Sequence, residues 1–244
     1  MGVGFAVPIN MARYVMDRLL NEGKVSRGYL GLSLQPELSP DLVKQFKLPD
    51  MNGALVTSVE ASSPASKAGF KDGDFVTEFN GRKVSDMRQL RLMVSQTAPG
   101  TKVTVKLLRD GVEKTLTATL VSLPEDLLTR SGQSKPGRGQ SSTDALDGVE
   151  VADLDARSRR EAGIPSTIHG ALVANVDQDS NAADAGLRAG DVVMEINRQT
   201  VHSAEDAVAL SEKAKGDRIL LRVWRGGEGR GGTFFMSVDN TKRK

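Results

Sequence analysis

The chain has 244 residues, of which 26% are charged and 39% hydrophobic, and its formal net charge is +2. These values are ordinary for a soluble globular protein and give no large field that would attract nucleic acid or an anionic membrane. No apolar run approaches the ~18 residues of a membrane span, and Met1 is not followed by the basic and then apolar pattern of a signal peptide. The absence of cysteine excludes disulfides, thiolate chemistry and sulfur ligands for zinc. The length accommodates two domains of about 100 residues with tails.

The first 25 residues predict a short strand followed by a helix. Residues 2–8, GVGFAVP, are small or apolar and suit a strand. Asn10 can cap a helix in which Val15, Leu19 and Leu20 recur at helical spacing. We interpret this helix as a connector into the first domain; a plain N-terminal helix is the alternative.

Residues 27–34, RGYLGLSL, predict a glycine-containing loop that leads into a strand. Leu30, Leu32 and Leu34 alternate with small residues, as on a half-buried strand whose edge is free to pair with another strand. Glycine permits the backbone angles at which several N–H groups point into one concavity, where an anion can bind. An ordinary first strand is the alternative that these residues leave open.

A short helix is expected at residues 39–46, and residues 53–84 then predict a strand, a helix of about one turn and a second strand. Ser63 and Pro64 supply the N-cap and first residue of that short helix, and Gly69 supplies its left-handed end. The second strand alternates large apolar with polar residues until Asn80-Gly81, a dipeptide typical of tight turns.

The remainder of the first domain predicts a helix and a hairpin. Ser85 or Asp86 can cap a helix that carries Met87, Leu90 and Val94 on one face, with Arg91 beside them. Residues 101–108 and 113–121 alternate as strands do, and Arg109-Asp110-Gly111 between them is a hairpin signal.

The stretch 53–84 returns as residues 170–201, with 15 of 32 positions identical. A single duplication of this length indicates two copies of one domain. Residues 131–143, SGQSKPGRGQSST, separate the copies and have the composition of a flexible linker, so we expect the second domain to reorient against the first. The expected organisation is a connector at 1–25, a first domain at 26–125, a linker at 126–144, a second domain at 145–240 and a tail at 241–244.

The repeated pattern A-x-x-A-G-[FL]-[KR]-x-G-D-x-[VI]-x-x-[FI]-N occupies residues 65–80 and 182–197 and resembles the signature of circularly permuted, bacterial-type PDZ domains. Two such domains after the segment GVGFAVP resemble the HtrA (Deg, Do-like) serine proteases, in which a similar segment closes the protease domain. The resemblance implies an α+β fold, mainly β, in which each domain is a small partly open barrel or sandwich with two helices. It covers nearly the whole chain except the linker.

The resemblance also implies a peptide-binding groove in each domain, between the strand after the glycine loop and the second helix. In the first domain Met87, Arg91 and Val94 would face the peptide and Leu90 the core, although the whole stripe could equally be core. The peptide-binding residues implied are Tyr29, Leu30, Gly31, Leu32, Leu34, Met87, Arg91 and Val94 in the first domain, and Gly148, Val149, Ala204 and Val208 in the second.

The second domain departs from this pattern at its loop, which has the sequence LDGVEV at residues 146–151. Asp147 and Glu150 would repel an incoming terminal carboxylate, so we expect the second domain mainly to make domain or subunit contacts. Residues 225–232, RGGEGRGG, are glycine- and arginine-rich, but they lie between two expected strands, at 219–224 and 233–238, and contain Glu228. They do not change the expectation of no nucleic-acid partner.

The sequence holds no set of residues for hydrolysis. A serine protease needs a nucleophile, a histidine base and an orienting carboxylate, whereas His169 and His202 are the only histidines and both are expected at the surface. The nucleophile motif G-N-S-G-G of the HtrA family is absent, and we expect no metal and no cofactor. The chain alone is therefore expected to be inactive.

Two classes of function stay open. In the first, the chain is the regulatory part of a periplasmic HtrA-like endopeptidase and chaperone, in which it captures hydrophobic C-termini of unfolded proteins by strand addition. The partners implied are such polypeptides, the missing protease domain and further copies in a trimer-based homo-oligomer. In the second, the chain is a non-proteolytic scaffold that holds an oligomer or a fixed partner.

Overall fold

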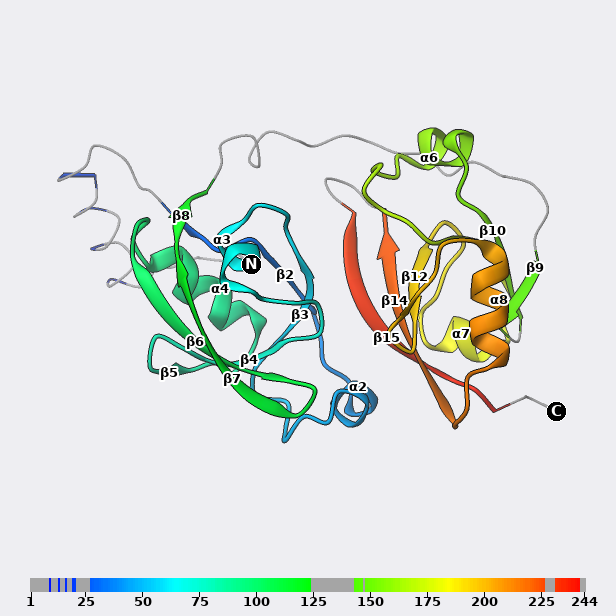
Figure 1. Cartoon of the computed structure of the whole chain (residues 1–244), viewed down its shortest axis with the longest axis horizontal. Helices are drawn as coiled ribbons and strands as arrows, with labels where there is room; N and C mark the ends of the chain where they lie inside the picture. Colours follow the sequence, from blue (N-terminus) through cyan, green and yellow to red (C-terminus); the bar gives the residue numbers. More distant parts are fainter. Residues whose placement is uncertain are drawn as a thin grey trace, which may run out of the picture.

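The computed structural model describes residues 27–123, 143–146, 148–226 and 231–241, and five further helical positions, 9, 13, 16, 19 and 20. The strand expected at 2–8 and most of the expected linker lie outside these residues. Both domains are mainly β, with open sheets and short helices (Figure 1). None of the helices within the described ranges is long and apolar enough to cross a bilayer.

The first domain is an open antiparallel sheet in the order β2-β3-β4-β6-β7, with β5 paired to β4 and a separate β1–β8 pair. Because β2 ends the sheet, its outer edge is free within this sheet. The elements are β1 (Gly28–Tyr29), β2 (Leu32–Leu34), α2 (Pro40–Gln45), β3 (Ala54–Val59), α3 (Pro64–Ala68), β4 (Phe75–Phe79), β5 (Arg82–Lys83), α4 (Met87–Gln96), β6 (Lys102–Arg109), β7 (Val112–Thr119) and β8 (Val121–Ser122).

The second domain repeats this sheet with one strand more, in the order β15-β14-β12-β11-β10-β9 with β13 paired to β12. Its extra strand begins at Thr143, inside the expected linker. The elements are β9 (Thr143–Leu146), β10 (Val149–Asp153), α6 (Ala156–Ala162), β11 (Ala171–Val176), α7 (Asn181–Asp184), β12 (Val192–Ile196), β13 (Gln199–Thr200), α8 (Ala204–Glu212), β14 (Arg218–Arg225) and β15 (Gly232–Asp239).

The helix ends lie where the sequence predicts them. Ser63 caps α3 by accepting a hydrogen bond from the amide of Ser66, and Gly69 ends that helix with a left-handed φ of 83°. Asp86 rather than Ser85 caps α4, because its carboxylate accepts a hydrogen bond from the Gln89 amide at 2.8 Å. These caps satisfy backbone groups that helix ends leave without partners, so the helices begin and end at defined residues.

A buried aspartate explains why the two copies of the motif share the same spacing. Asp74 is fully buried, accepts the Lys71 amide at 2.9 Å and pairs with the Arg109 guanidinium at 2.6 Å. Arg109 also donates to the Gly69 carbonyl, which ends α3, and its hydrogen bond to the aspartate raises its pKa. The aspartate therefore ties the end of the short helix to the strand β6.

The second domain makes the same set of contacts. Asp191 accepts the Arg188 amide at 2.9 Å and pairs with Arg225 at 2.6 Å, and Arg225 donates to the Gly186 carbonyl at 2.7 Å. The motif thus encodes a structural contact in each copy, because its aspartate holds the chain rather than facing a ligand.

The two domains share a hydrophobic cluster, so the second domain packs against the first in this structure. Phe46 from the loop after α2 meets Phe235 of β15 edge-on, with ring centroids 4.9 Å apart. The Gln35 side chain, which follows β2, both donates to the Phe235 carbonyl and accepts its amide, at 3.0 and 2.9 Å. The buried members of the cluster are Leu42, Phe46, Leu55, Phe75, Leu220 and Phe235.

An arginine at the centre of this interface joins both domains. The buried guanidinium of Arg222 pairs with Glu195 of its own domain and with Asp72 of the first, at 2.5 Å each, and its Nε donates to the Thr57 carbonyl at 3.1 Å. Burial raises the pKa of Asp72 above its ordinary value of 3.8, although Arg222 opposes the shift. Since β14 is covered by its own core on one face and by the first domain on the other, its sequence RILLRVWR lacks clean alternation.

Candidate functional site

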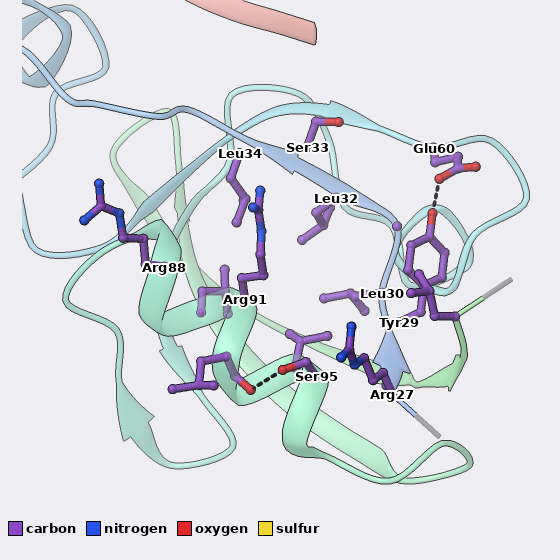
Figure 2. Close-up of a pocket in the computed structure, with 16 residues that line it drawn as sticks. Arg27, Tyr29, Leu30, Leu32, Ser33, Leu34, Glu60, Arg88, Arg91 and Ser95 are labelled. Carbon is purple, nitrogen blue, oxygen red and sulfur yellow. Dashed lines mark hydrogen bonds between the residues drawn. The ribbon is translucent and has the colours of Figure 1, made fainter. Parts of the chain in front are cut away.

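A groove of about 760 Å³ lies along the free edge of the first sheet, between β2 and α4 (Figure 2). Leu32 and Leu34 of β2 form one wall, and Arg91 and Val94 of α4 form the other. The lining is mostly apolar, as expected of a site that buries an apolar side chain. Seven of the eight residues predicted for this groove line it; the seven are Tyr29, Leu30, Gly31, Leu32, Leu34, Arg91 and Val94.

The eighth residue, Met87, is not among the lining residues and packs partly buried against the core. Leu90, which the sequence places towards the core, is buried there and also contributes to the groove floor. Two further residues, Arg27 and Arg88, also line the groove, although the family pattern does not assign them to it. Their positions in the sequence could have indicated this, since Arg27 adjoins the glycine loop and Arg88 lies one helical turn before Arg91.

The loop at one end of the groove has little room for side chains. Gly31 has a left-handed φ of 83°, and a Cβ on it would lie 2.2 Å from the Cβ of Ser63. The carbonyls of Leu30 and Gly31 accept the amides of Ala65 and Glu60, at 2.9 and 3.0 Å. Because a trans peptide directs its N–H opposite to its C=O, the amides of Gly31 and Leu32 point away from these two donors.

The position of the loop relative to α4 sets the direction of the groove. A Cβ on Gly28 would lie 2.4 Å from the carbonyl oxygens of both Val94 and Thr97, so the loop passes against the last turn of the helix. The first turn of α4 lies at the other end, beside Leu34, as Figure 2 shows with Arg88. The Tyr29 hydroxyl donates to the Glu60 carboxylate at the loop end of the groove.

The corresponding groove of the second domain holds a segment of the chain itself. Gly148 repeats the conformation of Gly31, with a φ of 75°, next to Ser180, the counterpart of Ser63. The strand β9 then pairs antiparallel with β10, with Leu146 opposite Val149 and Thr143 opposite Val151, and β9 also contacts α8 (Figure 1). The segment therefore lies where an added peptide strand is expected, between β10 and α8.

The predicted binding residues of the second domain lie in or next to β10 and α8, the two elements that contact this strand. Val149 and Ala204 are buried in the second core, and Val208 packs partly buried against it, as Leu146 does. The amide of Ala204 donates to Asp153 at 2.8 Å, which joins the start of α8 to the end of β10. Their role in binding stays a prediction, as does that of Gly148.

Neither histidine lines the first groove. His169 precedes β11 and His202 precedes α8, and both are exposed, as the sequence predicts. Among the described residues, no three side chains of histidine, aspartate or glutamate converge as metal ligands.

Comparison with known proteins agrees with this architecture. Sequence profiles described as PDZ domain match residues 28–120 and residues 172–225. A probable periplasmic serine endoprotease, DegP-like, of Chlamydia muridarum is 35% identical over 225 residues, which are 92% of this chain and 43% of that protein. Its namesake of Rhizobium meliloti is 36% identical over 247 residues, 99% of this chain and 46% of that protein.

A solved structure of the HtrA-type protease AlgW with a decapeptide is 33% identical and covers 50% of this chain and 38% of its own, with a TM-score of 0.45. The chain spans less than half the length of the two curated relatives. With both domain profiles matched and the identity to the DegP-like proteins running through both domains, the chain is a tandem of two PDZ domains that belongs to the HtrA, or DegP-like, serine endoprotease family.

Proposed function

We propose that the first PDZ domain captures hydrophobic C-termini of unfolded proteins by strand addition, as the regulatory part of a periplasmic HtrA-like endopeptidase and chaperone. The observation that carries this proposal is the free edge of β2, which faces α4 across an apolar groove closed at one end by a glycine loop. An added strand gains backbone hydrogen bonds from such an edge and specificity from pockets for alternate side chains.

The loop suits a terminal carboxylate for a geometric reason. The amides of Gly31 and Leu32 point away from the groups that bind the adjoining carbonyls, and an anion on that side would accept them. Arg27, which lines the same end of the groove, adds a positive charge. An internal peptide segment or an amidated terminus would lack the charge for these donors.

Titration of the whole chain with a labelled ten-residue peptide ending in valine, followed by fluorescence anisotropy, tests the proposal. The free acid is expected to bind and its C-terminal amide to bind at least about tenfold more weakly, because charge-assisted hydrogen bonds are the stronger ones. Leu32→Glu places a charge in the apolar groove and is expected to weaken binding about 100-fold. Thr117→Glu, on the exposed face of β7, is the control with the same added charge.

Equal affinity for acid and amide would remove the role of the loop. In a protein that also carries the protease domain, we expect Leu32→Glu to alter the activation of casein cleavage by a non-cleavable peptide. Lengthening the segment 126–142 is expected to change that activation little. Activation that survives Leu32→Glu would show that the first groove is not the sensor.

The scaffold alternative draws support from a different observation. The second domain buries Phe235 and Arg222 against the first domain and has its own chain in its groove. We therefore assign the second domain to domain and subunit contacts within the proposed regulatory unit.

A further inference from the structure

The helical wall of the first groove carries positive charge that the groove itself does not neutralise. Arg88 and Arg91 are exposed and line the groove one helical turn apart. The single acidic residue among the lining residues is Glu60, which lies at the loop end and accepts the Tyr29 hydroxyl. Within the described ranges the Arg91 side chain has no ion-pair partner, and Arg88 has only the exposed Asp86 of the helix cap near it.

The direction of the groove places these arginines relative to a bound peptide. The last turn of α4 abuts the loop through Val94 and Thr97, so Arg91 and then Arg88 lie progressively farther from the loop. Three helical residues span about 4.5 Å. The Cα atoms of Arg91 and Arg88 therefore lie about 4.5 and 9 Å from that of Val94 along the helix axis, in the direction away from the loop. Figure 2 shows Arg91 above the helix, between it and Leu34, and Arg88 at the end far from Leu30.

A peptide that adds to β2 repeats its side chains on the helical face every second residue, about 6.6 Å apart. If its last residue lies at the loop, the residues two and four positions earlier face α4 about 7 and 13 Å from it. Arginine side chains are long enough to reach both positions from Arg91 and Arg88. A carboxylate at either position would meet a guanidinium without displacing an existing partner of Arg91.

We infer that the first groove selects C-terminal segments with acidic residues two and four positions before an apolar terminus. This inference rests on the proposed peptide capture and specifies its substrate class: an apolar end preceded by glutamate or aspartate. The selectivity is electrostatic and therefore weakens as salt rises.

The test uses the full chain and three labelled decapeptides that share a terminal valine and differ at the two upstream positions. These carry two glutamates, two glutamines or two lysines. The expected order of affinity is glutamate, glutamine, lysine, with about fivefold between neighbours in low salt, as for exposed ion pairs of up to ~1 kcal/mol. In 0.5 M salt the spread should shrink to less than about twofold.

Charge reversal separates a direct contact from a general field. Arg88→Glu combined with Arg91→Glu should reverse the order, so that the lysine peptide binds best. Lys102→Glu combined with Lys114→Glu makes the same change of charge on β6 and β7, outside the groove, and should leave the order unchanged. Both pairs are exposed, so folding should be unaffected, and circular dichroism checks this.

A flat series, or an order that the double arginine variant keeps, would overturn the inference. If the glutamine peptide still binds as acid and not as amide, such a result leaves the capture of C-termini intact. If none of the peptides binds, both proposals are wrong. A charge preference retained by amidated peptides would assign the arginines to an acidic surface of another protein and would also overturn the inference.

Discussion

The two grooves of this chain are built on one fold and differ at the positions that would touch a ligand. Gly31 and Gly148 share a left-handed backbone, and each abuts the serine that caps the following short helix. When the gapless alignment of the repeat is extended into the next helix, Arg88 corresponds to Glu205 and Arg91 to Val208. The helical wall of the second copy therefore lacks both positive charges. The two copies therefore share the glycine of the loop and differ in the charge of the helical wall.

The sheet edges differ as well. The chain before the first groove pairs with β8 and leaves β2 at the end of its sheet. The chain before the second groove turns back and pairs with β10 as β9, in the direction that a C-terminal peptide would take. An unpaired strand edge invites another strand, so the first edge is available for binding, whereas the second is covered within the molecule.

The largest effect is expected where the two domains are alike. Asp74→Ala leaves Arg109 without its buried partner and should lower the free energy of unfolding by about 3–5 kcal/mol. Asp191→Ala should cost a similar amount, because Arg225 makes the same contacts. Urea unfolding followed by circular dichroism measures both, with Glu78→Ala as the control since its ion pair with Lys106 is partly exposed. A loss of less than 1 kcal/mol for both aspartates would mean that the motif does not hold the fold.

A smaller loss of stability should distinguish the two domains at a position where both have an ion pair. Lys106 of β6 faces Glu78 of β4 in the first domain. Arg222 of β14 faces Glu195 of β12 at the equivalent position in the second. The first pair is partly exposed, whereas Arg222 is buried against Asp72 and the Thr57 carbonyl. Arg222→Ala should therefore cost about 2–3 kcal/mol, whereas Lys106→Ala should cost clearly less.

Calorimetry of the same two variants measures the number of thermal unfolding transitions. Because the shared cluster joins the domains, we expect the parent chain to unfold in one transition and Arg222→Ala to divide it into two. Equal effects of the two substitutions would mean that the interface adds nothing to the ion pair. Two transitions in the parent chain would support the expectation that the second domain reorients against the first.

Much of this fold could be predicted from the sequence, because turns and caps are local. Ser63, Gly69 and Asp86 occupy the helix ends assigned to them, and Asp110 and Gly111 form the two-residue turn between β6 and β7. Most of the first groove was also predicted, since its residues follow a family pattern. The contacts between domains could not be, because Phe46 and Phe235 have the appearance of ordinary core residues and are far apart in the sequence.

The strand β9 was hidden for a related reason. Residues 143–146, TDAL, carry no alternating pattern, and their pairing depends on an edge that only the folded domain provides. One signal was present in β14, where apolar residues fill both faces and Arg222 lies among them. Such a strand is typical of burial on both sides and would have indicated a neighbour for the second domain.

The covered edge of the second groove can be opened by substitution. Replacing residues 143–146 by Gly-Ser-Gly-Ser should remove β9 and raise amide exchange at residues 149–151 about tenfold or more, because their strand loses its neighbour. The control is the same replacement at residues 133–136. Calorimetric titration with a C-terminal peptide should then give a second, weaker site per chain, which the parent lacks. Unchanged exchange would show that β9 does not protect this edge.

The smallest effect concerns the caps of the two groove helices, which differ in their response to acid. Asp86 caps α4, and the hydrogen bond from the Gln89 amide holds its pKa below the ordinary 3.8. A lowered pKa means that the cap stabilises the folded chain above pH 3.8 and that this contribution is lost as the pH falls through the folded value. Ser203 caps α8 with a hydroxyl that does not titrate in this range.

Acid should therefore remove the carboxylate cap of α4, whereas the hydroxyl cap of α8 keeps its hydrogen bond. The amide proton of Gln89, followed by NMR, should shift with a midpoint below pH 3.8, and its exchange should quicken there. Asp86→Ser gives the first helix the cap of the second and should abolish the midpoint while keeping the helix, since serine and aspartate cap about equally well. A midpoint that survives in this variant would come from another carboxylate, and the first groove would then owe none of its acid response to its helix cap.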